Sequence, residues 1–277
     1  MNILITGCST GIGYQMAMSL ADEGYTIFAT VLHEEEKEQF KNRNIHPLIL
    51  NLLDKNSISQ CVEEAKLVAG GKIDVLINNA GIAVAGAIED LSYDVVTHQF
   101  QVNNFGLCEI TRLILPLMHQ AGHGKIINIS SMLGLTSFPY RGIYSASKHA
   151  LRAINDALRL ELKAINSPIS VSLIECGPMK TNIRENAIRL STQFINVKDS
   201  RYKNDYEVLL DATKNEQSML FIKSPVAIMK LIRKIIQSKK PKALYRFGSL
   251  PRILNFLKIV LPVNVYDKVI LYILSIE

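Results

Sequence analysis

Two residues of the sequence, Tyr144 and Lys148, combine side chains that could carry out acid–base chemistry. In an α-helix, a spacing of four residues places the phenol and the ammonium on the same face, one turn apart. A nearby positive charge favours the phenolate, so the ammonium could lower the phenol pKa from its ordinary value of about 10. Such a pair could donate a proton to a carbonyl oxygen, or accept one from an alcohol, near neutral pH. The spacing alone is common in helices, so its meaning depends on the residues around it.

Three further polar residues could complete this proton chemistry or serve the structure alone. Ser131 lies thirteen residues before the tyrosine, at the end of a predicted strand, where its hydroxyl could hold a substrate oxygen. Ser130 and Ser131 together could also be an ordinary strand-end cap. Asn103 lies in a long helical pattern, and because asparagine is a poor helix former we expect another role for it, with a half-buried polar group as the alternative. His149 should point about 100° away from the lysine and pack against the helix surroundings.

A glycine-rich turn lies between the first predicted strand and the first predicted helix. Glycines allow a tight turn in which backbone N–H groups at a helix N-terminus can bind a pyrophosphate. The spacing G-x-x-x-G-x-G differs from the general G-x-G-x-x-G pattern, so a purely structural turn is the alternative. Its position at the first β–α turn favours nucleotide binding, with these predicted contacts: Gly7, Ser9, Thr10, Gly11, Ile12 and Gly13.

A second cofactor-contacting segment is predicted at residues 78–81, where Asn-Asn-Ala-Gly follows the fourth predicted strand. The asparagine side chains could tie the strand end to its neighbours, and the small residues permit close approach of a ligand. A plain Asn/Gly turn is the alternative. The predicted cofactor contacts here are Asn79, Ala80 and Gly81.

The end of the second predicted strand usually decides between the two dinucleotide cofactors. A carboxylate there binds the ribose 2′-hydroxyl of NAD, and a basic group binds the 2′-phosphate of NADP. Residues 30–33 contain neither Asp nor Arg, and the three glutamates at 34–36 are predicted to form a solvated first helical turn. Because Ser9, Thr10 and His33 could accommodate a phosphate, NADP(H) is predicted over NAD(H).

Short apolar runs alternate with amphipathic segments of helical period along most of the chain. The runs are apolar on both faces, which is typical of central parallel strands. The alternation therefore predicts an α/β fold of the Rossmann type, a doubly wound parallel sheet with helices on both faces. The predicted strands are residues 2–6, 26–31, 46–50, 73–78, 125–130 and 169–174. The predicted helices are residues 12–24, 33–43, 55–69, 92–120 and 142–165.

The pattern becomes polar and irregular after the sixth strand, and residues 177–222 are predicted to be a loop that covers the site beyond the strand ends. A helix over 224–238 and a seventh strand over 242–247 should follow. We therefore expect a single dinucleotide-binding and catalytic domain, residues 1–248, with a helical C-terminal extension, residues 249–277.

The C-terminal extension contains an amphipathic helix that begins near Ser249 and a second apolar segment, residues 263–276. It is predicted to be a lid or a subunit-interface helix pair. The alternative is that residues 223–277 dock on an anionic membrane, because ten Lys and Arg residues and no acidic residue lie between Glu216 and Asp267. The helices over 92–120 and 142–165 are apolar enough to pair between subunits, so a homodimer or homotetramer is expected.

The composition argues against several other classes of protein. A chain of 277 residues, 48% of them hydrophobic, can bury the full core of one domain. The first strand leaves no room for a signal peptide, and no apolar run reaches transmembrane length, so we expect the cytoplasm, with association at the cytoplasmic face of a membrane as the alternative. The four cysteines lack metal-ligand spacing, which predicts reduced thiols and no metal. No Lys/Arg-rich reading helix is present, so nucleic-acid binding is not indicated.

Five motifs, in their order along the chain, resemble the short-chain dehydrogenase/reductase family over roughly residues 2–247. They are the glycine-rich turn, residues 78–81, Asn103, Ser131 and the pair Tyr144 and Lys148. The resemblance implies reversible hydride transfer between a nicotinamide and a carbonyl or alcohol. It implies that Tyr144 is the acid/base, that Lys148 lowers its pKa, and that both contact the cofactor. Ser131 would orient the substrate, and Asn103 would support a water relay.

The sequence Glu-Cys-Gly-Pro at residues 175–178 resembles the hydroxysteroid and retinol dehydrogenase branch of that family, which implies an apolar small molecule as substrate. By the same resemblance, the cofactor should also contact Asn51, Gly177, Pro178 and Thr181. Cys176 replaces a commoner proline, and Asn51 replaces a commoner aspartate. A non-catalytic, cofactor-binding regulatory protein of the same fold is the alternative function.

Overall fold

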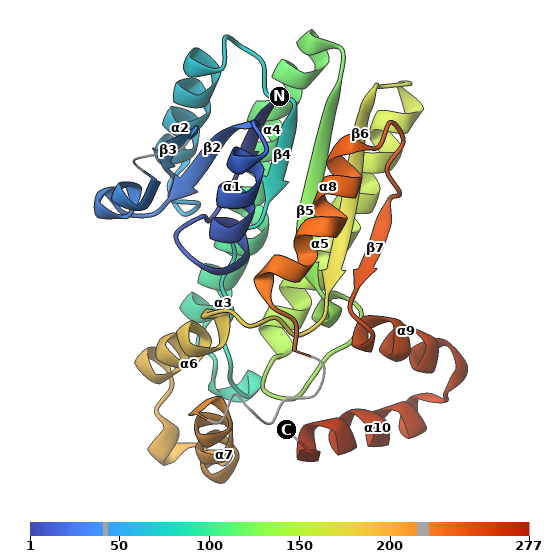
Figure 1. Cartoon of the computed structure of the whole chain (residues 1–277). Coiled ribbons are helices and arrows are strands. Elements are labelled where there is room, and N and C mark those ends of the chain that lie inside the picture. Colours follow the sequence, from blue (N-terminus) through green and yellow to red (C-terminus); the bar gives the residue numbers. More distant parts are fainter. Residues whose placement is uncertain (41–43, 215–221, 277) are drawn as a thin grey trace.

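The computed structural model describes residues 1–40, 44–214 and 222–276, and its centre is one parallel sheet of seven strands (Figure 1). The strand order is β3-β2-β1-β4-β5-β6-β7, so the order reverses between β1 and β4. The strands are β1 Asn2–Ile5, β2 Thr26–Val31, β3 Ile45–Ile49, β4 Val75–Asn78, β5 Gly124–Ser131, β6 Ile169–Cys176 and β7 Leu244–Phe247. The predicted fold class is confirmed, and ligands of such sheets bind at the carboxyl ends of the strands beside this reversal.

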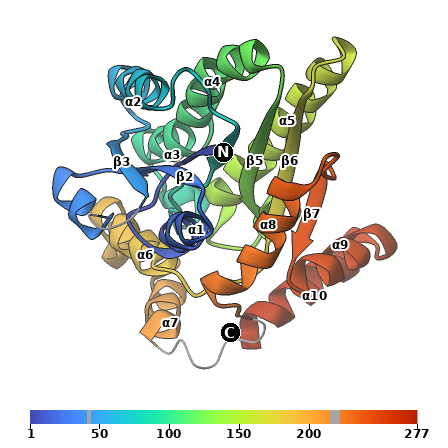
Figure 2. The same ribbon diagram turned by 45° about the horizontal axis from the view of Figure 1, so that its top comes forward.

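Alternating side chains of the interior strand β1 enter two separate cores, which explains why the strands are apolar on both faces. Ile3 and Ile5 pack in one core with α1 and α8, and Leu4 packs in the other with α2 and α4. All three side chains are completely buried. Helices therefore cover both faces of the sheet, as Figures 1 and 2 show.

The helices of the sheet layers follow the predicted order along the chain. Gly24, Gly70 and Gly122 have positive φ angles just past three helix ends, which is the conformation expected of glycine C-caps. Ser224 caps the turn before α8, because its hydroxyl accepts a hydrogen bond from the Val226 N–H. The helices are α1 Gly11–Asp22, α2 Lys55–Val68, α3 Tyr93–Phe100, α4 Leu107–Ala121, α5 Gly142–Ala164, α6 Ile183–Phe194, α7 Lys203–Lys214, α8 Met229–Gln237, α9 Leu250–Val260 and α10 Val263–Ile276.

Three predicted segments differ from the structure. The helix expected over 33–43 is a short 3₁₀ helix, η1 Glu34–Phe40, because Glu36 turns back to accept hydrogen bonds from the preceding backbone; residues 41–43 lie outside the described chain. The helix expected over 92–120 is interrupted by a π-helical turn, η3 Gln101–Gly106. The segment 177–222 is not an irregular loop, since it contains α6 and α7, although residues 215–221 are not described.

The carboxyl ends of the strands lie between two pairs of helices (Figure 1). On one side are α6 and α7, and on the other side α9 and α10 form a C-terminal hairpin, which Figure 2 shows from a second angle. Leu250, Leu254, Tyr266 and Ile270 of the hairpin pack in one buried cluster with Tyr144. Within the described residues, none of the helices combines the length and the apolar character needed to span a bilayer.

Candidate active site

A cavity of about 1030 Å³ opens at the carboxyl edge of the sheet. Its wall comes from the β1–α1 turn, the ends of β2, β4, β5 and β6, and the first turn of α5. Residues of α6, α7 and α10 close its outer side. The cavity therefore lies where the strand order reverses, the position at which parallel sheets bind dinucleotides.

The β1–α1 turn fits a bound pyrophosphate. Gly7 and Gly11 adopt left-handed φ angles of +71° and +62°. A Cβ on Gly13 would lie 2.0 Å from the Gly7 carbonyl oxygen, so only glycine lets the first turn of α1 approach the strand end this closely. Thr10 makes no side-chain capping bond to α1, which leaves the first N–H groups of the helix to face the cavity.

Residues 78–81 hold β4 against this turn. The Asn79 amide group donates to the Thr6 and Gly7 carbonyl oxygens, both at 2.9 Å. The Thr6 hydroxyl accepts the N–H groups of Asn79 and Ala80 at 3.0 and 2.9 Å. Asn79 therefore acts on the cavity by fixing the glycine-rich turn, which agrees with the predicted tie between strand ends.

Tyr144 is buried in the cavity wall, which Ser131 also lines. Burial raises the pKa of the phenol to about 12, and the Ser131 hydroxyl opposes that rise. The sequence led us to expect Lys148 to lower this pKa. In the structure burial dominates, and the Lys148 ammonium stands 5.7 Å from the centre of the tyrosine ring. The phenol is therefore protonated at neutral pH, the form that can donate a proton.

Lys148 is itself strongly affected by its surroundings. Burial lowers the pKa of its ammonium from 10.5 to about 8. Its Nζ donates to the Ile129 carbonyl oxygen at 3.3 Å. The neighbouring Cys176 is a neutral thiol, because burial raises its pKa to about 12. His149 turns away and contacts the Ser145 carbonyl oxygen, as predicted.

Asn103 lies in the π-helical turn, a local geometry that often marks functional positions. Its side-chain amide group accepts from the Ile82 N–H at 2.9 Å and donates to the Ile82 carbonyl at 2.9 Å and to the Ser147 hydroxyl at 3.0 Å. A Cβ on Gly81 would lie 3.2 Å from Asn103 Oδ1 and 3.6 Å from Lys148 Nζ. Asn103 therefore joins the loop after β4 to helix α5 beside the lysine.

Most of the predicted site residues meet in the cavity wall, and three do not. Gly13 and Asn103 lie behind the wall in the positions described above. Asn51 is directed elsewhere, since its side-chain oxygen accepts the Leu53 N–H at 3.0 Å in its own turn. The predicted residues that line the cavity are Gly7, Ser9, Thr10, Gly11, Ile12, Asn79, Ala80, Gly81, Ser131, Tyr144, Lys148, Gly177, Pro178 and Thr181.

The sequence reasoning missed two groups of cavity residues. Glu36 reaches the cavity from η1, although it was predicted to face solvent. The covering helices α6 and α7 contribute Asn186, Arg189, Asp205 and Val208, for which the sequence offered no motif. Asp90 holds α7 and the turn before it, because its carboxylate accepts from the Ser200 and Tyr206 hydroxyls, both at 2.6 Å.

A parallel sheet with a glycine-rich turn, a cavity at its switch point and a tyrosine–serine–lysine group in the cavity wall defines a dinucleotide-dependent oxidoreductase. A model of the short chain dehydrogenase family matches residues 1–190. The chain belongs to the short-chain dehydrogenase/reductase family.

Two curated relatives and two solved structures illustrate this membership. The probable short-chain type dehydrogenase/reductase VdlC of Helicobacter pylori is 36% identical over 275 residues, 96% of this chain and 94% of the relative. Retinol dehydrogenase 8 of Bos taurus is 29% identical over 86% of this chain and 78% of the relative. A short-chain dehydrogenase/reductase from Burkholderia phymatum in complex with NAD has a TM-score of 0.75 at 21% identity, covering 93% and 91% of the two chains. Serine dehydrogenase complexed with NADP⁺ has a TM-score of 0.73 at 23% identity, covering 90% and 95%.

The residues of the glycine-rich turn fit the pyrophosphate of a dinucleotide. The chain is therefore an oxidoreductase of this family, which counts against the alternative of a non-catalytic regulatory protein.

Proposed function

We propose that this enzyme transfers a hydride between a nicotinamide cofactor and an apolar carbonyl or alcohol, with Tyr144 as the acid/base. The observation that carries the proposal is that Tyr144, Ser131 and Lys148 line the same cavity wall, with the Lys148 ammonium 5.7 Å from the centre of the tyrosine ring. A bound nicotinamide would supply or accept the hydride.

The residues of the chain then have separate tasks. Ser131 binds the substrate oxygen and fixes its position next to the phenol. Tyr144 donates its proton as negative charge develops on that oxygen during reduction. The Lys148 ammonium favours the phenolate that is left, and it is protonated below a pKa of about 8. Asn103 positions helix α5 relative to the loop after β4, and its support of a water relay stays a prediction.

The outer part of the cavity supports an apolar substrate. Its wall includes Leu133, Phe138, Ile183, Val208 and Leu271. Apolar side chains bind hydrocarbon surface without an unpaired polar group, so a long-chain aldehyde, a retinoid or a steroid suits this wall. The name of the relative retinol dehydrogenase 8 agrees with this class of substrate.

Replacement of Tyr144 by Phe tests the mechanism. The variant keeps the ring in its cluster and removes the proton donor, so kcat should fall by about 10²- to 10⁴-fold while cofactor binding is unchanged. Turnover is measured with a panel of aldehydes, retinoids and steroids, and binding by the fluorescence of the reduced nicotinamide, against which a chain without tryptophan gives little background. The exposed Tyr93 provides the control variant Tyr93→Phe. A Tyr144→Phe enzyme with wild-type kcat would refute the assigned role.

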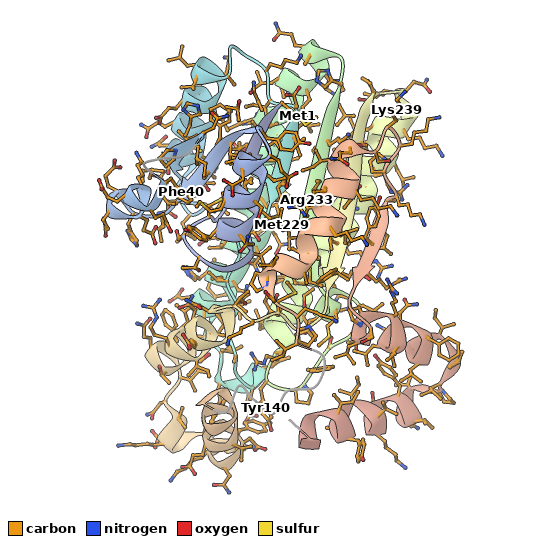
Figure 3. All side chains as sticks on the ribbon, in the orientation of Figure 1. Met1, Phe40, Tyr140, Met229, Arg233 and Lys239 are labelled. Atoms are coloured by element: carbon orange, nitrogen blue, oxygen red, sulfur yellow. The ribbon has the colours of Figure 1, made fainter. Side chains whose placement is uncertain are left out.

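Membrane docking of the C-terminal hairpin remains a proposal, and the structure supports it by exposed apolar residues more than by the basic stretch. Figure 3 shows Lys239 far from Tyr140 and the hairpin. Lys239 lines a separate pocket with Met1 at the other end of the sheet. Lys239 therefore lies away from α9 and α10, although α9 itself carries Arg252 and Lys258 of the basic stretch. The proposal now depends on outward apolar residues such as Phe256 and Ile259, 63% and 74% exposed.

Self-association through α4 and α5 also remains a proposal. Phe105, at the end of the π-helical turn before α4, and Leu160 of α5 are 62% and 54% exposed, which supports pairing of these helices between subunits. The domain boundary at residue 248 and the cytoplasmic location also stay predictions.

A further inference from the structure

The carboxylate of Glu36 is held by three hydrogen bonds to a single oxygen atom. Glu36 Oε2 accepts from the Ser9 hydroxyl at 2.8 Å and from the backbone N–H groups of Leu32 and His33, both at 3.0 Å. Partial burial works against the charged form, but the hydrogen bonds from His33, Ser9 and Leu32 outweigh it, and the pKa of Glu36 lies below its ordinary value. Glu36 is therefore a fixed negative charge at neutral pH.

These four residues form one corner of the cavity. Ser9 belongs to the glycine-rich turn, Leu32 and His33 follow β2, and all of them line the cavity together with Glu36. In this fold the ribose of the adenosine half lies at the end of the second strand, next to the pyrophosphate. The corner therefore faces the ribose 2′ position of a bound dinucleotide.

The corner has the donors of a phosphate site, but the chain itself supplies the anion. One hydroxyl and two backbone N–H groups converge on one oxygen, as they would on a phosphate oxygen. Among the described residues of the cavity wall, the lysine and arginines are Arg141, Lys148 and Arg189, which come from the α5 region and α6. The elements of this corner contribute neither lysine nor arginine to the described wall, and His33 is their basic side chain there.

We infer that Glu36 is a specificity-determining residue that selects NAD(H) over NADP(H). A 2′-hydroxyl can donate to the carboxylate, whereas a 2′-phosphate would meet a like charge and find its hydrogen-bond donors already used. The inference rests on the proposed function only for the use of a nicotinamide cofactor. It reverses the preference for NADP(H) predicted from the sequence, because that prediction placed Glu36 in solvent.

Cofactor binding without substrate tests the inference. NADH and NADPH are titrated by nicotinamide fluorescence, and the fragments 5′-AMP and 2′,5′-ADP by calorimetry. The wild-type chain should bind NADH at least about tenfold more tightly than NADPH, since a hydrogen bond to a charged group is worth about a factor of ten or more. Glu36→Gln, which keeps the size of the side chain and removes its charge, should reduce that ratio about tenfold.

Two further variants keep the test independent of folding. Leu32→Arg leaves all three hydrogen bonds to Glu36 intact, because Leu32 contributes only its backbone N–H and its side chain is 49% exposed. It should strengthen NADPH binding about tenfold by adding a guanidinium beside the phosphate. Glu35→Gln, an exposed carboxylate on the same 3₁₀ helix, should leave the ratio unchanged.

The possible outcomes separate this inference from the proposed function. Tighter binding of NADPH than NADH by the wild-type chain overturns the inference, and so does a ratio that Glu36→Gln and Glu35→Gln leave equally unchanged. Failure to bind either cofactor refutes the proposed function instead. Inactivity toward every carbonyl in the panel leaves the binding ratio, and thus the role of Glu36, intact.

Discussion

Replacing Lys148 by Met should make the folded protein more stable at neutral pH, although it removes a residue assigned to catalysis. Burial lowers the pKa of the ammonium from 10.5 to about 8. Each pKa unit corresponds to about 1.4 kcal/mol, so the buried charge lowers the free energy of unfolding by about 3 kcal/mol. Methionine has a similar length and no charge, and it loses only the hydrogen bond to Ile129, worth about 1 kcal/mol. The expected net gain at pH 7 is about 2 kcal/mol.

The sign of the effect follows from proton binding. Below pH 8 the lysine is protonated in both the folded and the unfolded chain, so the folded protein carries the full penalty of the buried ammonium. Between pH 8 and 10.5 the folded protein loses this proton before the unfolded chain does, and the free energy of unfolding therefore rises with pH. The advantage of Lys148→Met should shrink through this range and nearly vanish by about pH 10.

Urea unfolding of the cofactor-free protein at pH 7 and pH 10 measures both parts of this prediction. Lys163→Met, an exposed lysine near the end of the same helix, is the control and should change the unfolding free energy by less than about 0.5 kcal/mol at either pH. A Lys148→Met variant that is less stable than the wild type by the same amount at both pH values would show that burial does not penalise the ammonium. It would also remove the reason for a lysine pKa of about 8 in the proposed mechanism.

Two more changes test other parts of the structure. Gly13→Ala places a Cβ 2.0 Å from the Gly7 carbonyl oxygen, so it should lower the free energy of unfolding by about 1–3 kcal/mol and weaken cofactor binding. The control is Gly24→Ala, where φ is +84° and nothing lies within 4 Å of the new Cβ. It should lower the free energy of unfolding by about 1–2 kcal/mol without affecting cofactor binding. Thermal melts and nicotinamide titrations compare the two, and equal cofactor affinity in both variants would contradict the close approach. If the hairpin docks on lipid, Phe256→Ser should reduce sedimentation of the full chain with anionic vesicles. The control Leu67→Ser, at an 81% exposed position on α2, should sediment like the wild type. A wild-type chain that stays in the supernatant excludes docking.

The sequence predicted the parts of this site that depend on residues adjacent along the chain. Strand ends and the turns after them are encoded by apolar runs followed by Gly, Asn or Ser, and parallel strands bring their carboxyl ends to one edge. The family resemblance added the pairing of Ser131 with Tyr144, and both residues line the cavity in the structure.

Contacts that depend on distant pairing could not be predicted. The hydrogen bond between Ser9 and Glu36 joins residues 27 positions apart, and a run of three glutamates resembles a solvated helix start. The cofactor contact of Asn51 stays a prediction, and the hydrogen bond of its side chain to the Leu53 N–H is a local contact that sequence spacing does not reveal. The hydrogen bond from Asn103 in the π-helical turn to Ser147 of α5 is a contact that no pattern within the helix indicates.

The packing of the C-terminal hairpin against Tyr144 has a consequence for the order in which the enzyme becomes competent during synthesis. The sheet strands β1 to β6 and the tyrosine are complete by residue 176, but the hairpin residues that bury the tyrosine cluster are made later: Leu250, Leu254, Tyr266 and Ile270. Chains fold from their N-terminal part as they are synthesised. A nascent chain can thus form the nucleotide-binding sheet while its phenol is still open to water, and the dry site that raises the phenol pKa is finished only once α9 and α10 have left the ribosome.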